Sequence, residues 1–186
     1  MEKKRPIYLD NNATTPLDPL VFAAMRTYFE SEFGNPSSQS HCYGWETSSA
    51  VEKARKLVAK SINAEPAELF WTSGATESNN WAILGLARKA DKKIHVITTA
   101  TEHKAVLEVC FQATREGHEM TVVPVDKTGQ VSVAEIEKAL QPNTALVSVI
   151  FANNEIGTIN RMKEIGAFCK SKNILLHTDA TQALGK

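Results

Sequence analysis

Four polar segments of the chain each follow an apolar run of strand length, and each carries side chains that could bind a ligand. They are residues 73–80, 101–104, 153–157 and 177–182. In an open α/β sheet, ligands bind beyond the carboxyl ends of the strands. The small residues around Gly74 would let the N–H groups of a following helix face an anion such as phosphate. An ordinary helix cap by Ser73 or Thr76 is the alternative explanation.

The other three segments offer groups of different chemistry. His103 opens a helix and could stack on a ring or move a proton, or simply cap that helix. Asn153 and Asn154 could bind a carboxylate or hydroxyl, or form a turn with Gly157. Asp179 follows an apolar strand, where a carboxylate needs a partner such as a cationic ring nitrogen, unless it caps a helix. Phosphate anchoring, ring stacking and an acid for a ring nitrogen together match what pyridoxal phosphate needs from a protein.

Sequence patterns typical of strands and helices alternate along the chain, and the elements that they predict must position these groups. We expect strands at residues 7–9, 69–72, 95–98, 119–123, 145–151 and 174–177, and helices at 21–33, 45–62, 76–88, 103–116, 133–140 and 161–172. This alternation predicts an α/β fold with three α/β/α layers around a mostly parallel sheet. No repeat, linker or low-complexity stretch interrupts the pattern, which favours one domain.

Composition excludes several classes of protein. The 186 residues include 21 Lys and Arg, 21 Asp and Glu, and 42% hydrophobic residues, too apolar for a disordered chain. The formal net charge of zero gives no reason to expect binding to nucleic acid or to an anionic membrane, and no apolar run is long enough to span one. No Cys-x-x-Cys or His-Glu-x-x-His occurs, so we expect no metal site. The basic start has no apolar run behind it, and with three scattered cysteines it favours a cytoplasmic location.

Six segments together resemble the cysteine desulfurases of the NifS/IscS type, which belong to the class V aminotransferases and use pyridoxal 5'-phosphate. They are Asp-Asn-Asn-Ala-Thr-Thr-Pro (10–16), Phe-Gly-Asn-Pro-Ser-Ser (33–38), Thr-Ser-Gly-Ala-Thr-Glu-Ser (72–78), Thr-Glu-His-Lys (101–104), Asn-Asn-Glu-Ile-Gly (153–157) and His-Thr-Asp-Ala-Thr-Gln (177–182). The resemblance implies a fold-type I transferase, with residues 1–186 as the N-terminal part of its cofactor-binding large domain. It also implies removal of sulfur from L-cysteine, giving alanine and a persulfide for iron–sulfur cluster assembly.

The same resemblance implies a role for six residues. Ala75 and Thr76 would hold the cofactor phosphate. Asn154 would lie near the ring hydroxyl and the substrate, and Gln182 would hydrogen-bond that hydroxyl. Asp179 would pair with the protonated ring nitrogen, which strengthens the ring as an electron sink. His103 would stack on the ring and assist proton transfer, and it is the one catalytic candidate.

Other groups that the resemblance implies are not supplied by these residues. Family members are much longer, and their Schiff-base lysine lies well beyond the Asp-Ala-Thr-Gln segment, so Lys186 is too close to it. The cysteine that takes the persulfide and the arginine that binds the substrate carboxylate also fall beyond residue 186. Cys110 and Cys169 are instead expected as small core residues. We therefore expect the C-terminal part of the large domain and the small domain to be absent, and the chain alone to be inactive.

The expected partners follow from this missing half. They are a second chain with the C-terminal half, in a homodimer or a heterotetramer of halves, and an iron–sulfur scaffold protein. An unpaired sheet edge would make the chain depend on such association for its stability. The chain could be a natural split subunit, a cleavage product or a truncated piece. Alternative functions are another class V enzyme, such as a selenocysteine lyase or an aminotransferase, and a non-catalytic scaffold.

Overall fold

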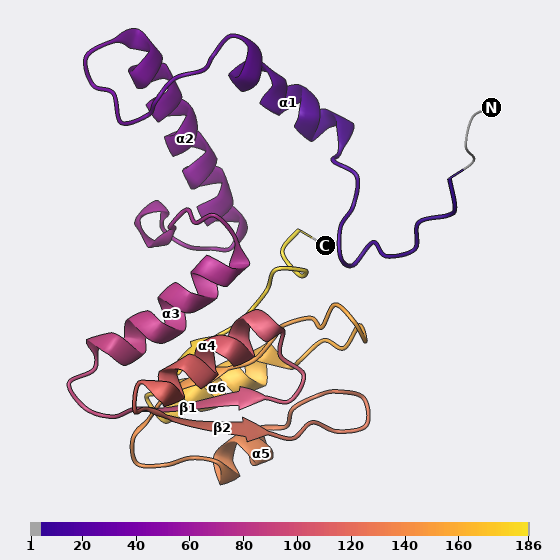
Figure 1. Cartoon of the computed structure of the whole chain (residues 1–186), viewed down its shortest axis with the longest axis vertical. Helices are drawn as coiled ribbons and strands as arrows, with labels where there is room; N and C mark the ends of the chain where they lie inside the picture. Colours follow the sequence, from indigo (N-terminus) through magenta and orange to yellow (C-terminus); the bar gives the residue numbers. More distant parts are fainter. Residues whose placement is uncertain (1–4, 186) are drawn as a thin grey trace. The chain divides into compact units, whose positions relative to one another are not determined.

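The computed structural model describes residues 5–185 and divides at Trp71 and Thr72 into two compact units, which are coloured along the chain in Figure 1. The first contains α1 (Pro19–Glu30), α2 (Cys42–Ser61) and the short 3₁₀ helix η1 (Pro66–Glu68). The second contains α3 (Ala75–Lys89), β1 (His95–Thr99), α4 (Lys104–Arg115), β2 (Glu119–Val123), α5 (Val133–Lys138), β3 (Thr144–Ser148), α6 (Met162–Ser171) and β4 (Leu175–His177). The expectations for the basic start at 1–4 and for Lys186 lie outside the described residues.

In the first unit, local signals define α1. The Asp18 carboxylate caps the helix by accepting a hydrogen bond of 2.7 Å from the N–H of Leu20, and Pro19 begins the helix with a backbone angle that suits it. No residue of α1 is buried.

No helix within residues 5–185 combines the length and apolar character that crossing a membrane requires.

The second unit contains a sheet of four parallel strands in the order β2-β1-β3-β4. All five residues of β1 are buried, as expected for a central strand. The register places Ile97 opposite Thr121 on β2 and Val147 on β3, and Val147 opposite Leu176 on β4. Because all four strands run the same way, their carboxyl ends lie at one edge of the sheet. This confirms the predicted α/β fold with a parallel sheet.

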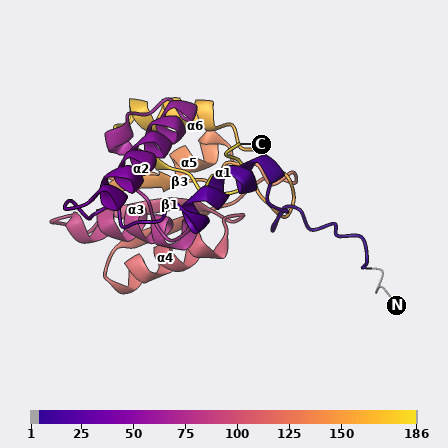
Figure 2. The same ribbon diagram turned by 90° about the horizontal axis from the view of Figure 1, so that it is seen from above.

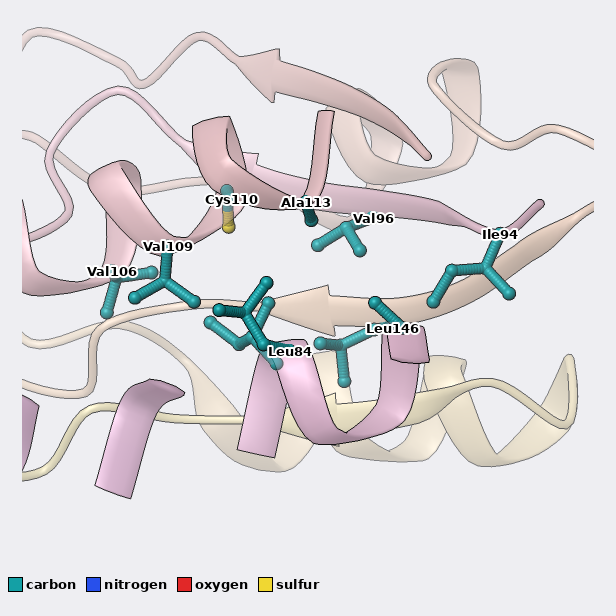
Figure 3. Close-up of a cluster of buried hydrophobic side chains, with 10 residues drawn as sticks. Leu84, Ile94, Val96, Val106, Val109, Cys110, Ala113 and Leu146 are labelled. Atoms are coloured by element: carbon teal, nitrogen blue, oxygen red, sulfur yellow. The ribbon is translucent and has the colours of Figure 1, made fainter. Parts of the chain in front are cut away.

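Helices cover both faces of this sheet, as Figure 2 shows with α5 and α6 on one side of β1 and β3 and with α3 and α4 on the other. Against α3 and α4 lies an apolar cluster shown in Figure 3, which includes Leu84, Ile94, Val96, Val106, Val109, Cys110, Ala113 and Leu146. Against α5 and α6 lies a second cluster, of Ile97, Val123, Val131, Ile136, Val147, Val149, Ile165 and Cys169. The three predicted layers are therefore confirmed.

The two cysteines that were expected in the core are there. Cys110 is 0% exposed and Cys169 is 1% exposed. On α4, Cys110 shares a buried face with Val106, Val109 and Ala113, at the spacing of an amphipathic helix. These residues anchor the helix that begins next to His103.

Two predicted strands are wrong. Residues 7–9 and 69–72 form no strand, and no described segment pairs with them. A strand needs a neighbour for its N–H and C=O groups, and an apolar run alone does not provide one. The carbonyl of Leu69 instead accepts a hydrogen bond from the Arg55 guanidinium. The other predicted elements occur, with ends shifted by a few residues; the strand expected at 145–151 ends at Ser148.

Candidate functional site

The amino end of α3 is the first part of the candidate site. Gly74 precedes the helix and offers no side-chain cap, so the N–H groups of Ala75 and Thr76 begin the helix without a side-chain acceptor. Glu77 turns back and accepts hydrogen bonds from the hydroxyl of Ser73 at 2.5 Å and its N–H at 2.7 Å, and these bonds hold the pKa of Glu77 below its ordinary value. The cap by Ser73 or Thr76 that the sequence allowed is not formed. The start of α3 is thus available to an anion.

His103 caps α4 at the same edge of the sheet. Its side chain is exposed, and Nδ1 accepts a hydrogen bond of 3.1 Å from the N–H of Ala105. That bond assigns the proton of the neutral ring to Nε2. A hollow of about 390 Å³ is lined by Thr76, Asn80, His103, Lys104, Ala105, Glu108, Val109 and Gln112. The structure therefore brings Thr76 and His103 to one hollow.

Asp179 follows β4 and is only 7% exposed. Oδ1 accepts hydrogen bonds from Thr181, at 2.6 Å from the hydroxyl and 3.0 Å from the N–H, and Oδ2 accepts one of 3.1 Å from Nδ2 of Asn79. Burial opposes ionisation, but the hydrogen bonds from Thr181 and Asn79 outweigh it and hold the pKa of Asp179 below its ordinary value. The carboxylate is thus ionised at neutral pH. With one donor on Oδ2, it can accept another from a cation.

Asn79 is a functional candidate that the sequence analysis missed, although it lies within residues 73–80. It is 4% exposed. Its place in the pattern could have revealed it, because Asn79 lies four residues before Ile83 and eight before Ala87, on the buried face of α3. A polar residue on such a face needs a partner, which is Asp179. Asn79 therefore ties the start of α3 to the acid after β4.

The segment that follows β3 is a turn held by Asn153. Its Oδ1 accepts hydrogen bonds from the N–H groups of Glu155 at 2.8 Å and Ile156 at 3.0 Å. Its Nδ2 donates to the carbonyl of Thr101 at 2.8 Å. Gly157 has φ of 72°, a backbone angle that glycine adopts without strain. The turn interpretation explains Asn153 and Gly157, and it leaves Asn154 for ligand contact.

Asn154 and Gln182 lie near the same strand ends. Asn154 is half-buried, and its side chain makes no hydrogen bond within the part of the chain that the structure describes. Gln182 is half-buried in the turn that follows Asp179. Thr76 and His103 share a hollow and Asp179 is hydrogen-bonded to Asn79, whereas Asn154 neither lines that hollow nor makes a hydrogen bond with these residues.

Glu102 is a second buried acid, which the sequence analysis passed over in favour of its neighbour His103. It is 7% exposed. Its Oε1 accepts hydrogen bonds of 2.7 Å from the hydroxyl of Thr99 and 2.7 Å from the N–H of Ile150. Burial raises its pKa to about 7; these two hydrogen bonds act against that rise, and the charge of Asp179 adds to it. The one feature of the sequence that could have singled out Glu102 is its position between the end of a predicted strand and the start of a predicted helix.

Comparison with known proteins identifies relatives along the whole chain. The family model for aminotransferase class-V matches residues 7–186. The mitochondrial cysteine desulfurase of Arthroderma benhamiae is 53% identical over 188 residues, covering 100% of this chain and 37% of that protein. The mitochondrial cysteine desulfurase of Saccharomyces cerevisiae is 54% identical over 183 residues, covering 98% of this chain and 37% of that protein. The solved structure of a NifS-like protein has a TM-score of 0.89 and 43% identity, over 94% of this chain and 48% of that one.

These findings bear on the location and the family that the sequence predicted. The chain spans 37% of the length of both curated relatives. Both are named mitochondrial, so the expected cytoplasmic location is contradicted. Within residues 5–185, no group of three or more His, Cys, Asp or Glu side chains is placed to hold a metal ion. The family model covers nearly the full sequence, and a solved NifS-like structure shares its fold: the chain belongs to the aminotransferase class-V family.

Proposed function

We propose that residues 1–186 form the N-terminal part of the large domain of a pyridoxal-phosphate-dependent cysteine desulfurase. The observation that carries this proposal is identity above 50% to two curated cysteine desulfurases across 98% or more of the chain. The substrate is then L-cysteine, and the products are alanine and a persulfide on the enzyme. The names of these relatives favour mitochondria as the place of the reaction.

The residues at the strand ends fit pyridoxal phosphate. The open start of α3, at Ala75 and Thr76, suits the phosphate group, because helix N–H groups and the helix dipole favour an anion. The ionised, buried carboxylate of Asp179 suits a protonated ring nitrogen. Asn154 and Gln182 have amide groups for the ring hydroxyl and the substrate. When bound, the cofactor supplies an electron sink for the carbanion chemistry of an amino acid.

His103 supplies a hydrogen-bond donor beside the cofactor ring in this proposal. Its Nδ1 is occupied by the N–H of Ala105, so the proton of the neutral ring is on Nε2. The exposed ring can therefore stack on the cofactor and donate from Nε2. The cap therefore leaves the Nε2–H group of His103 to donate a hydrogen bond to a bound ligand.

The remaining length of the relatives would supply the other groups of the complete enzyme. These are the lysine that binds the cofactor, the cysteine that takes the persulfide and the arginine that binds the substrate. We propose that they reside in a polypeptide segment or second chain that carries the C-terminal half and the small domain. Assembly as a dimer and transfer of sulfur to an iron–sulfur scaffold protein complete the proposal.

Cofactor binding by the full chain tests this function. Equilibrium dialysis against pyridoxal phosphate, read by its absorbance, compares the wild-type chain with Asp179→Asn. We expect affinity to fall about tenfold or more, because the ring nitrogen loses a charged hydrogen-bond partner worth at least ~1.4 kcal/mol. The matched control is Asp91→Asn, at an exposed position outside the site. Equal affinities of all three proteins would contradict the proposed role of Asp179.

A further inference from the structure

Glu102 joins the ends of the two central strands of the sheet. Thr99 is the last residue of β1, and its hydroxyl donates to Glu102 Oε1 at 2.7 Å. Ile150 lies two residues beyond the end of β3, and its N–H donates to the same oxygen at 2.7 Å. The paired strands have ended there, so the Glu102 carboxyl serves as the acceptor that a longer β1 would have provided.

The segment after β3 continues this connection to Asp179. The N–H of Phe151 donates to the backbone carbonyl of Asp179 at 3.0 Å, and the N–H of Val149 donates to that of His177 at 3.0 Å. On the other side, Asn153 donates to the carbonyl of Thr101. Residues 150–153 are therefore hydrogen-bonded on one side to the turn before His103, through Ile150 and Asn153, and on the other side to the backbone of Asp179, through Phe151.

We propose that Glu102 is a positioning residue whose buried carboxyl fixes His103 and Asp179 relative to each other by holding the carboxyl ends of β1 and β3 together. This inference rests on the proposed function for the roles of His103 and Asp179. The hydrogen bonds themselves can be tested without cofactor, so failure of this proposal and failure of the cofactor proposal are distinguishable.

The surroundings of Glu102 add an electrostatic link. Oε2 is buried and has no hydrogen-bond partner among residues 5–185. The titratable groups that interact with Glu102 there are Asp179 after β4 and Cys110 on α4, and His103 is its neighbour in the chain. Burial and the negative charge of Asp179 both favour the neutral carboxyl. While Glu102 keeps its proton, Asp179 is the one charged member of this buried pair.

Amide hydrogen exchange measures directly whether Glu102 holds the segment that follows β3. In Glu102→Ala the N–H of Ile150 loses its acceptor and should exchange about tenfold faster or more. Glu102→Gln keeps an oxygen and should stay within about threefold of wild type when both are compared well below the pKa of Glu102, where neither side chain is charged. The amides of Val149 and Phe151 are internal controls, because backbone carbonyls accept from them. Equal exchange of Ile150 in Glu102→Ala and wild type would overturn the proposal.

Carboxyl ¹³C NMR of glutamate-labelled full chain tests the electrostatic link, which a purely structural role would not require. One glutamate should titrate near pH 7 in wild type and be missing from the spectrum of Glu102→Gln. In Asp179→Asn its midpoint should move to lower pH, because a negative charge is removed. A midpoint unchanged in Asp179→Asn, or no glutamate titrating above its ordinary range, would refute the link between the two acids.

Discussion

Replacing Glu102 by Gln should change how the stability of the chain depends on pH. The substitution keeps an oxygen that can accept hydrogen bonds from Thr99 and Ile150. It removes the ionisable carboxyl of a residue that is only 7% exposed. The amide has no charge at any pH. The variant therefore isolates the cost of ionising this carboxyl inside the fold.

The magnitude follows from the pKa of Glu102, which is raised from 4.5 to about 7 in the folded chain. Because the folded state holds the proton more tightly than the unfolded state, the resulting stabilisation is present below pH 4.5 and is lost as pH rises through about 7. The rise in pKa corresponds to about 3 kcal/mol of unfolding free energy. Relative to wild type, Glu102→Gln should therefore gain about 3 kcal/mol between about pH 4 and about pH 8.

Urea unfolding at a series of pH values measures this difference. Subtracting the wild-type free energy at each pH cancels the titration of groups that both proteins share. The matched control is Glu155→Gln, at an exposed position that lacks a side-chain hydrogen bond in the described residues, and its difference from wild type should stay flat. A difference between Glu102→Gln and wild type that is equally flat would refute the reasoning about burial.

Three further variants or reactions test other parts of the structure. His103→Ala should lower the unfolding free energy by about 1 kcal/mol by removing the cap of α4, whereas His103→Asn should retain it; equal thermal stabilities would contradict the cap. Asn160→Ala should cost about 2 kcal/mol in urea unfolding, since buried backbone groups of Val131 and Ile150 lose their partners, and an unchanged unfolding free energy would contradict this role of the Asn160 amide. A thiol reagent should label exposed Cys42 at once and buried Cys110 only on unfolding, and rapid labelling of Cys110 would refute its burial.

The parts of the fold that the sequence predicted are those in which local pattern and packing agree. Helix α4 has apolar residues at helical spacing and a capping histidine, and it forms within a residue of its expected limits. Residues 69–72 have an equally apolar run but pair with no described segment, and pairing is a nonlocal property that no short window contains. The pattern of apolar residues therefore predicts that a segment can be buried, but it does not predict which other segment will pack or pair with it.

The candidate site shows the same division. Asp179 could be singled out because an acid beside an apolar strand needs a partner, but the identity of that partner depends on a distant helix. Asn79 is one hundred residues away in sequence, and Glu102 meets Ile150 forty-eight residues away. Such pairs are created by the order of strands in the sheet, which the sequence alone left open.

The measurement that tests the central claim most directly is the formation of alanine from L-cysteine. The assay combines the chain with a polypeptide that corresponds to the remaining length of its relatives. Pyridoxal phosphate and L-cysteine are then added. We predict that alanine and enzyme-bound sulfur appear in equal amounts, and that Asp179→Asn in the same assembly nearly abolishes both. Cofactor bound without alanine, or amino transfer to a keto acid in its place, would contradict assignment as a cysteine desulfurase.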